Sequence, residues 1–310
     1  MKKACLCILL IVILAATGCI RKIPVKNLLS DNSNQEYDTM VKRDILCIMM
    51  AYPGYVTKVE SVDGKVYIIM KSGNRILYDD KRLKSPDEKM ENCDIQDMME
   101  QIYPLYGIKE LMKNDFDPGR FRVYSLLHDV YGNSSVQVQS NLKTIKTGCG
   151  YYQFNRNNKA ADALCGALNE LSEIMAKRND IRSVVLPSSG TFNYRYIAGT
   201  RRLSPHSFGI AIDLARNKRD YWKWASQSEG AKRLANYPHE VPAVFEKYNF
   251  IWGGKWSHFD ILHFEYRPEI IYKARFFGDN IESEKPWYGD VLSEKSDYRA
   301  YIEIIERALK

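Results

Sequence analysis

The stretch "SPHSFGIAID", residues 204–213, places the strongest local constraint on the fold. It contains His206 and Asp213, with Gly209 between them. On a continuous helix the two side chains would lie about 10 Å apart along the axis, and in an extended strand about 23 Å apart on opposite faces. A reversal at Gly209 that leads into a strand over 210–215 brings them together, because glycine tolerates the backbone angles of tight turns. We therefore predict a turn followed by a strand.

Two interpretations of this stretch remain open. In the first, His206 and Asp213 bind one metal ion, and the small Ala211 leaves room for it on the face of the strand that Asp213 shares. In the second, Asp213 is a capping carboxylate and His206 is a residue of the turn. These ten residues do not distinguish the two.

A second stretch, "WSHFDILHFEYRP" at 256–268, favours the metal. It contains Asp260, His263 and Glu265, in a chain with 5 histidines in all. In a strand over 261–266, His263 would point away from the apolar face. A third ligand there completes a His-Asp-His set with one open position, which is typical of catalytic zinc. Asp260 is placed to shuttle a proton beside it.

The two stretches together resemble the M15 peptidases. The pattern S-x-H-x-x-G-x-A-x-D is carried here by Ser204, His206, Gly209, Ala211 and Asp213. It is similar to the zinc signature of that family, which comprises D-alanyl-D-alanine carboxypeptidases and dipeptidases and phage L-alanyl-D-glutamate endopeptidases. The element Asp260-x-x-His263 matches the family's base and last ligand. The resemblance covers about residues 185–270.

This resemblance implies one Zn²⁺ per chain, held by His206, Asp213 and His263, with Asp260 as the general base. An aspartate in that role is similar to the endopeptidase branch. The family also uses an upstream arginine to bind substrate and stabilise the oxyanion, for which Arg195 in "SGTFNYR" is the first candidate. Further candidates for contact with the substrate or the ligands are Arg202, Ser204 and Glu265.

The implied function is a zinc-dependent peptidase that hydrolyses peptidoglycan stem peptides. Either a D-Ala-D-Ala carboxypeptidase or an L-Ala-D-Glu-type endopeptidase fits the pattern. One alternative is a metal-containing lipoprotein that binds the cell wall without hydrolysis. Another is a zinc hydrolase of a different peptide or amide.

The N-terminus predicts export. Lys2 and Lys3 precede an uncharged run over 4–20 that is short for a membrane span and typical of a signal peptide. The ending "ATGC" resembles a lipobox, which makes Cys19 a candidate for lipidation and the bacterial membrane a partner. The protein would then face the periplasm or the cell wall. The alternative is an ordinary signal peptide with a chance cysteine.

The net charge and the cysteines give little further information about function. Removal of residues 1–18 lowers the formal charge from +7 to +5, without a long basic run, so nucleic acid is not expected as a partner. Four cysteines remain besides Cys19, and an exported protein can pair them in three ways that sequence does not rank. They are Cys47, Cys93, Cys149 and Cys165.

Apolar periodicity and turn signals predict an α+β protein, with a small antiparallel sheet and flanking helices. The resemblance implies the zinc fold shared by DD-peptidases and Hedgehog proteins. Helical patterns occur at 38–50, 85–105, 159–178, 240–250 and 298–309, strands at 65–70 and 75–80, and a strand-like, turn-rich stretch at 183–215. The expected divisions are a signal peptide (1–18), a tether (19–36), an N-terminal α+β region (37–145), the peptidase domain (146–280) and a C-terminal docking helix (281–310).

Overall fold

The computed structural model describes residues 25–278 and 285–310. The signal peptide and the lipidation candidate Cys19 lie outside these residues. The chain divides into two compact units, 1–38 and 39–310. Helices and small antiparallel sheets alternate in the second unit, which confirms the α+β class. Among the described residues, no helix is both long and apolar enough to cross a membrane.

Helix α1 (Val25–Ala51) begins well before the start expected at residue 38. The polar stretch 28–36, expected as part of a tether, is therefore helical here. It lacks apolar periodicity, so the sequence pattern registers only the later turns, whose side chains are buried from Asp44 to Ala51.

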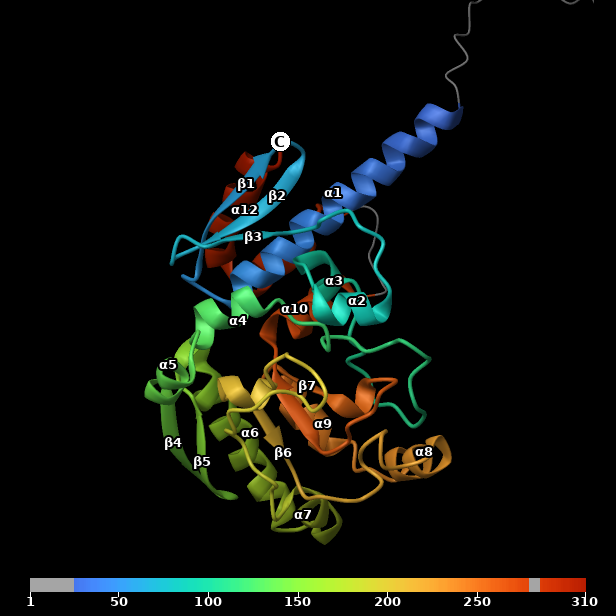
Figure 1. The fold of residues 1–310 in the computed structure, drawn as a ribbon, viewed down its shortest axis with the longest axis vertical. Helices are drawn as coiled ribbons and strands as arrows, with labels where there is room; N and C mark the ends of the chain where they lie inside the picture. The colour runs from blue at the N-terminus through green and yellow to red at the C-terminus, as the bar shows by residue number, and fades with distance from the viewer. Residues whose placement is uncertain (1–24, 279–284) are drawn as a thin grey trace, which may run out of the picture. The chain divides into compact units, whose positions relative to one another are not determined.

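The strands predicted at 65–70 and 75–80 belong to a three-stranded antiparallel meander, against which the C-terminal helix packs. Its strands are β1 (Val56–Val62), β2 (Lys65–Met70) and β3 (Arg75–Leu77), in antiparallel order β1-β2-β3. Helix α12 (Arg299–Ala308) contacts β1, as Figure 1 shows, and buries Ile302 and Ile305. The helical pattern predicted at 298–309 is thereby confirmed.

Residues 85–105 form two short helices, although their spacing predicted continuous helix. These are α2 (Pro86–Glu91) and α3 (Ile95–Met99). Each starts with its own capping box, at Ser85 and at Asp94. The Asp94 side chain accepts a hydrogen bond from the Asp97 amide at 2.9 Å. A cap in the middle of the periodic stretch satisfies the free amides of a new helix and so ends the old one.

Residues 101–123, which we call the strap, contain no helix or strand and run against the region expected as a separate peptidase domain. Lys255 Nζ donates to the Pro104 carbonyl at 2.6 Å, and Trp256 Nε1 donates to the Pro118 carbonyl at 2.9 Å. Residues 39–310, which include the strap and the region expected as the peptidase domain, form one compact unit.

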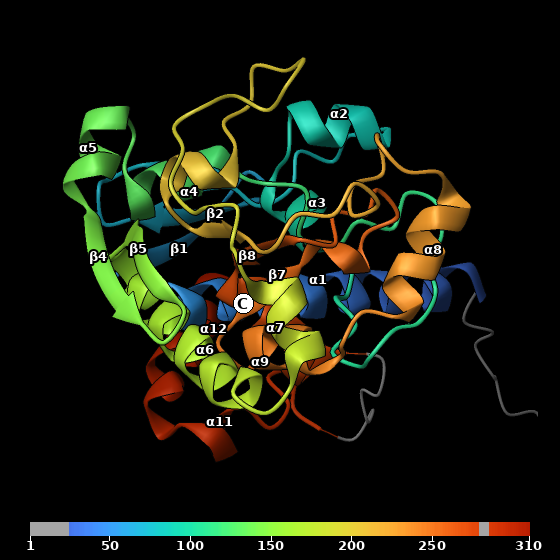
Figure 2. The ribbon, with the colours of Figure 1, turned by 90° about the horizontal axis from the view of Figure 1, so that it is seen from below.

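The middle of the chain holds three elements that the sequence did not indicate, two strands and a helix. Strands β4 (Leu142–Thr147) and β5 (Gly150–Asn155) form a hairpin beside α6 (Ala160–Met175), visible in Figure 2. Helix α6 confirms the pattern at 159–178. Helix α7 (Asn179–Val185) replaces the start of the expected strand-like stretch. Its Val184 and Val185 favour strands locally, but their burial in the last turn of the helix outweighs that preference.

The third sheet carries the two motif stretches. Its antiparallel order is β6-β8-β7, with β6 (Ala211–Asp213), β7 (Phe250–Trp252) and β8 (His263–Tyr266). On its apolar face Phe264 stacks on Phe245 of α9 (Glu240–Lys247) at 4.1 Å between ring centroids. Helix α9 confirms the prediction at 240–250. Both motif strands are shorter than the expected 210–215 and 261–266.

The remaining elements are short helices and turns. They are α4 (Tyr124–Tyr131), α5 (Ser135–Ser140), α8 (Gln227–Ala235), α10 (Pro268–Phe277), α11 (Val291–Glu294) and the 3₁₀ turns η1 (Asn157–Lys159), η2 (Pro205–Phe208), η3 (Gly253–Lys255) and η4 (Ser296–Tyr298). The four cysteines whose pairing the sequence left open are free thiols in the structure.

Candidate metal centre

The turn that presents His206 ends at Gly209. Residues Pro205–Phe208 form η2, and the amide of Gly209 donates to the His206 carbonyl at 3.1 Å. Gly209 has a φ of +66°, which side-chain-bearing residues rarely adopt. A Cβ there would lie 2.7 Å from Leu142 Cδ2. Glycine therefore allows the chain to reverse into β6, as the sequence predicted.

The pairing of β6 with β8 brings the second motif to the first. Asp213 is the direct partner of His263 across the two antiparallel strands. His263 Nδ1 lies 2.9 Å from Asp213 Oδ1, and His206 Nε2 lies 3.2 Å from the same oxygen. The two ring nitrogens are 3.3 Å apart. Three donor atoms from segments some fifty residues apart thus converge on one point.

The chemistry of this set fits zinc. Ligand atoms about 2.0–2.1 Å from a tetrahedral zinc are separated by about 3.4 Å, close to the observed spacings. His206 Nδ1 lies 2.5 Å from the Thr191 carbonyl, which holds its proton on that side and directs Nε2 to the shared point. His206, Asp213 and His263 would hold the metal, with both rings buried.

Glu265 lies on the Nε2 side of His263, which faces away from the other two candidate ligands. It is fully buried and lies 3.8 Å from His263 Nε2. Arg122 of the strap binds it through Nε at 2.8 Å and Nη2 at 2.5 Å, and Arg267 adds a contact at 3.4 Å. Burial alone would raise the pKa of Glu265, but the two arginines and His263 hold it well below its usual value. The candidate ligand His263 therefore lies beside a carboxylate whose charged form the surrounding groups favour.

Asp260 lies just before β8, and burial is the largest cause of the shift in its pKa. Burial raises the pKa of Asp260 to about 7, and Asp213 and Asp220 add to the shift while His263 opposes it. A carboxylate with such a pKa can both accept and return a proton near neutrality.

Two of the three candidate ligands, Asp213 and His263, have pKa values that shift in opposite directions. Burial would raise the pKa of Asp213, but its hydrogen bonds to His206 and His263 lower it well below the usual range. Burial would lower the pKa of His263, but Asp213 and Glu265 raise it to about 10. Without metal, His263 therefore carries a proton that its partners stabilise.

One cavity of about 370 Å³ connects these groups. Its wall includes the three metal-binding candidates, Asp260, Arg195 and Ser204. It also includes residues that sequence reasoning missed: Arg120, Arg122, Arg216, Tyr221, Trp222 and Trp224. Three of them form an aromatic run at 221–224 beside basic residues, a local pattern in the sequence that could have indicated a binding surface. The two strap arginines lie in a segment without a motif.

The two candidate arginines differ in their placement. Arg195 lines the cavity with an exposed side chain. Arg202 does not line it, because its Nε pairs with Glu91 of α2 at 3.1 Å. Ser204 is buried, and its carbonyl accepts a hydrogen bond from the Ser207 amide at 2.8 Å within the turn.

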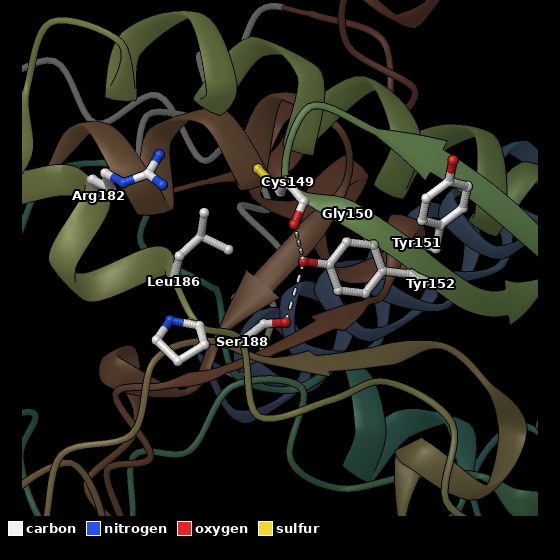
Figure 3. Close-up of a pocket in the computed structure, with 8 residues that line it drawn as sticks. Cys149, Gly150, Tyr151, Tyr152, Arg182, Leu186 and Ser188 are labelled. Carbon is white, nitrogen blue, oxygen red and sulfur yellow. Dashed lines mark hydrogen bonds between the residues drawn. The ribbon is translucent and has the colours of Figure 1, made fainter.

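Two other features lack comparable chemistry. A cavity of about 540 Å³ beside the β4–β5 turn contains Cys149, whose carbonyl accepts from Tyr152 Oη at 3.1 Å (Figure 3). Burial raises the pKa of the Cys149 thiol to about 11, so it is no activated nucleophile. The acidic cluster Asp79, Asp80 and Asp94 surrounds a cation already, because Lys84 Nζ lies 2.8 Å from Asp94 Oδ2.

The comparisons with known proteins concern the same segment. Residues 198–266 match the family model Peptidase_M15_4, described as D-alanyl-D-alanine carboxypeptidase. The match spans the three metal-binding candidates and Asp260. It supports membership of the M15 peptidases, which typically depend on zinc, and with it a peptidase activity. No curated protein and no solved structure matched the chain.

Proposed function

We propose that this protein is a zinc-dependent peptidase that hydrolyses peptide bonds in peptidoglycan stem peptides. The observation that carries the proposal is the convergence of His206, Asp213 and His263 at zinc-ligand spacing in one cavity with Asp260. The family match over 198–266 supports the peptidase class. We extend the proposal to the fold type, the zinc fold of DD-peptidases and Hedgehog proteins.

The residues divide the chemistry among them. Zinc, when bound, supplies a Lewis acid that polarises the scissile carbonyl and favours deprotonation of the attacking water. Asp260 takes the proton of that water and returns it to the leaving amine, for which its raised pKa suits it. Arg195 donates to the carbonyl oxygen as it gains negative charge. Glu265 holds His263 in its ligating orientation.

The activity is tested by digestion of purified sacculi and mass analysis of the released fragments. Loss of a single alanine identifies a D-Ala-D-Ala carboxypeptidase. Cleavage inside the stem identifies an endopeptidase of the L-Ala-D-Glu type. Release of no fragment by zinc-loaded protein would reject hydrolysis of stem peptides and leave the two alternatives, a cell-wall-binding lipoprotein that keeps the metal and a zinc hydrolase of a different peptide or amide.

Metal content and turnover separate the roles of the residues. We expect about one zinc per wild-type chain, lost in His206→Ala and retained in Asp260→Ala, which should lose turnover because no base remains. His239→Ala is the matched control, because that ring lies outside the cavity and its side chain is 81% exposed. Full activity in Asp260→Ala would reject this residue as the base.

We further propose that the protein is exported and anchored to a bacterial membrane through a lipid on Cys19, facing the periplasm or the cell wall. The basic start, apolar run and lipobox-like ending of residues 1–19 support this. Labelling with a radioactive fatty acid tests it: the wild type should incorporate label, and Cys19→Ala should not.

A further inference from the structure

A histidine–aspartate pair lies in the wall of the same cavity and has no part in the roles assigned above. His258 Nδ1 lies 2.6 Å from Asp117 Oδ2 of the strap. Asp117 is buried, and it also accepts from Arg120 Nη1 at 3.0 Å and from the His258 amide at 3.0 Å. The strap therefore fixes the position and the orientation of this ring.

The hydrogen bond to Asp117 determines which nitrogen of His258 is free. A carboxylate accepts, so Nδ1 carries the proton and Nε2 of the neutral ring carries a lone pair. Within 25–278 and 285–310, Nε2 has no hydrogen-bond partner. The side chain is 31% exposed and lines the cavity, with its ring edge-on to Trp222 at 4.6 Å between centroids.

The segment around His258 does not need the ring to hold its place. The Ser257 amide donates to the Phe116 carbonyl at 2.8 Å, and Trp256 Nε1 donates to the Pro118 carbonyl at 2.9 Å. With the His258 amide and the Ser257 hydroxyl, which donates to Asp117 Oδ1 at 3.3 Å, four hydrogen bonds tie this segment to the strap through groups other than the imidazole. The ring is thus positioned by the fold without being required for it.

The hydrogen-bonding groups of the cavity wall indicate what the His258 ring can contribute to ligand binding. Arg120, Arg195 and Arg216 line the wall and can only donate hydrogen bonds, to carbonyl or carboxylate oxygens of a ligand. A peptide also presents N–H groups, which need acceptors once they leave water. We propose that His258, oriented by Asp117, accepts a hydrogen bond through Nε2 from an N–H of the bound peptide. This inference rests on the proposed peptidase function.

Two amide substitutions separate this contact from a structural role. His258→Asn retains an N–H near the Nδ1 position for Asp117 but has no atom where Nε2 was. His258→Gln places a carbonyl oxygen near the Nε2 position but loses the Asp117 contact. Loss of one neutral hydrogen bond predicts a fall in kcat/KM of about tenfold for His258→Asn. The Gln variant should recover part of this loss.

The readouts are kcat/KM for a stem peptide, zinc content and the unfolding temperature. Both variants should keep one zinc per chain. The inference would be overturned if the His258→Asn variant were as active as the wild type or more active than the His258→Gln variant. His258 would then be only a structural partner of Asp117. A wild type that cleaves no stem peptide would instead reject the proposed function, so the two failures are distinguishable.

A measurement on unsubstituted His258 gives an independent test if the variants fold poorly. The ¹⁵N resonances of the ring, recorded in the zinc-loaded Asp260→Ala protein, should show the Nδ1–H tautomer. Addition of stem peptide should move the Nε2 resonance more than that of Nδ1. An Nε2–H tautomer, or an Nε2 resonance that peptide leaves unchanged, would overturn the inference.

Discussion

Glu265→Gln tests whether buried charge behind the ligands maintains the metal centre. The substitution keeps the volume of the side chain and removes its negative charge. Glu265 is fully buried between Arg122 and Arg267. Arg267 retains Glu269, whose Oε1 lies 2.6 Å from its Nε, whereas Arg122 is paired with no other carboxylate among the described residues.

The expected loss of stability follows from the charge of Arg122, which would remain buried without its partner. Removal of one partner of a buried ion pair costs about 3–5 kcal/mol, since the other charge remains out of water. For a chain of this size, that lowers the unfolding temperature by on the order of 10 °C. His263 also loses the charged group 3.8 Å from its Nε2, and loss of such a partner weakens metal binding about 10–100-fold.

The assay is thermal unfolding of the metal-free protein, followed by zinc titration against a competing chelator. Glu303→Gln is the matched control, an exposed glutamate of α12, and should change the unfolding free energy by less than about 0.5 kcal/mol. If Glu265→Gln unfolds and binds zinc like the control, then the arginines are satisfied in another way and the reasoning about Glu265 is wrong.

Two further predictions concern the turn and the ligands. Gly209→Ala should lower the free energy of unfolding by about 2–4 kcal/mol, because it adds a contact at 2.7 Å to the strain of a positive φ. Gly199→Ala is the control, since Gly199 has a φ of +79° and open space around it and should show the strain alone. Equal losses of unfolding free energy in urea would exclude a contribution from the contact. Zinc binding should displace the proton of His263, whose pKa is raised to about 10 in the metal-free protein, so the affinity should rise about tenfold per pH unit from pH 7 to 9. A zinc affinity that is flat over this range, after correction for protonation of the chelator, would contradict the assigned protonation of His263.

Local patterns in the sequence predicted the elements whose stability comes from their own neighbours in the chain. The periodic apolar positions at 159–178, 240–250 and 298–309 are helices in the structure, because one apolar stripe is enough to dock a helix. The turn at Gly209 was predictable for the same reason, since glycine adopts such a positive φ more readily than residues with a side chain. The motif residues and their resemblance to M15 peptidases were likewise visible without a structure.

Only the tertiary structure decided which distant segments meet. The pairing of Asp213 with His263 depends on the register between β6 and β8, which is determined by packing of the whole sheet and by no short stretch. The hairpin at 142–155 escaped prediction because few of its side chains are buried, so its alternation is weak. The strap had no motif at all, and its Asp117 and Arg122 gain their meaning only from His258 and Glu265 across the fold. Hydrogen bonds and ion pairs between segments this far apart leave no periodic signal in the sequence. The candidate ligands and Glu265 were therefore readable from the chain, while the strap residues that hold Glu265 and His258 in place were not.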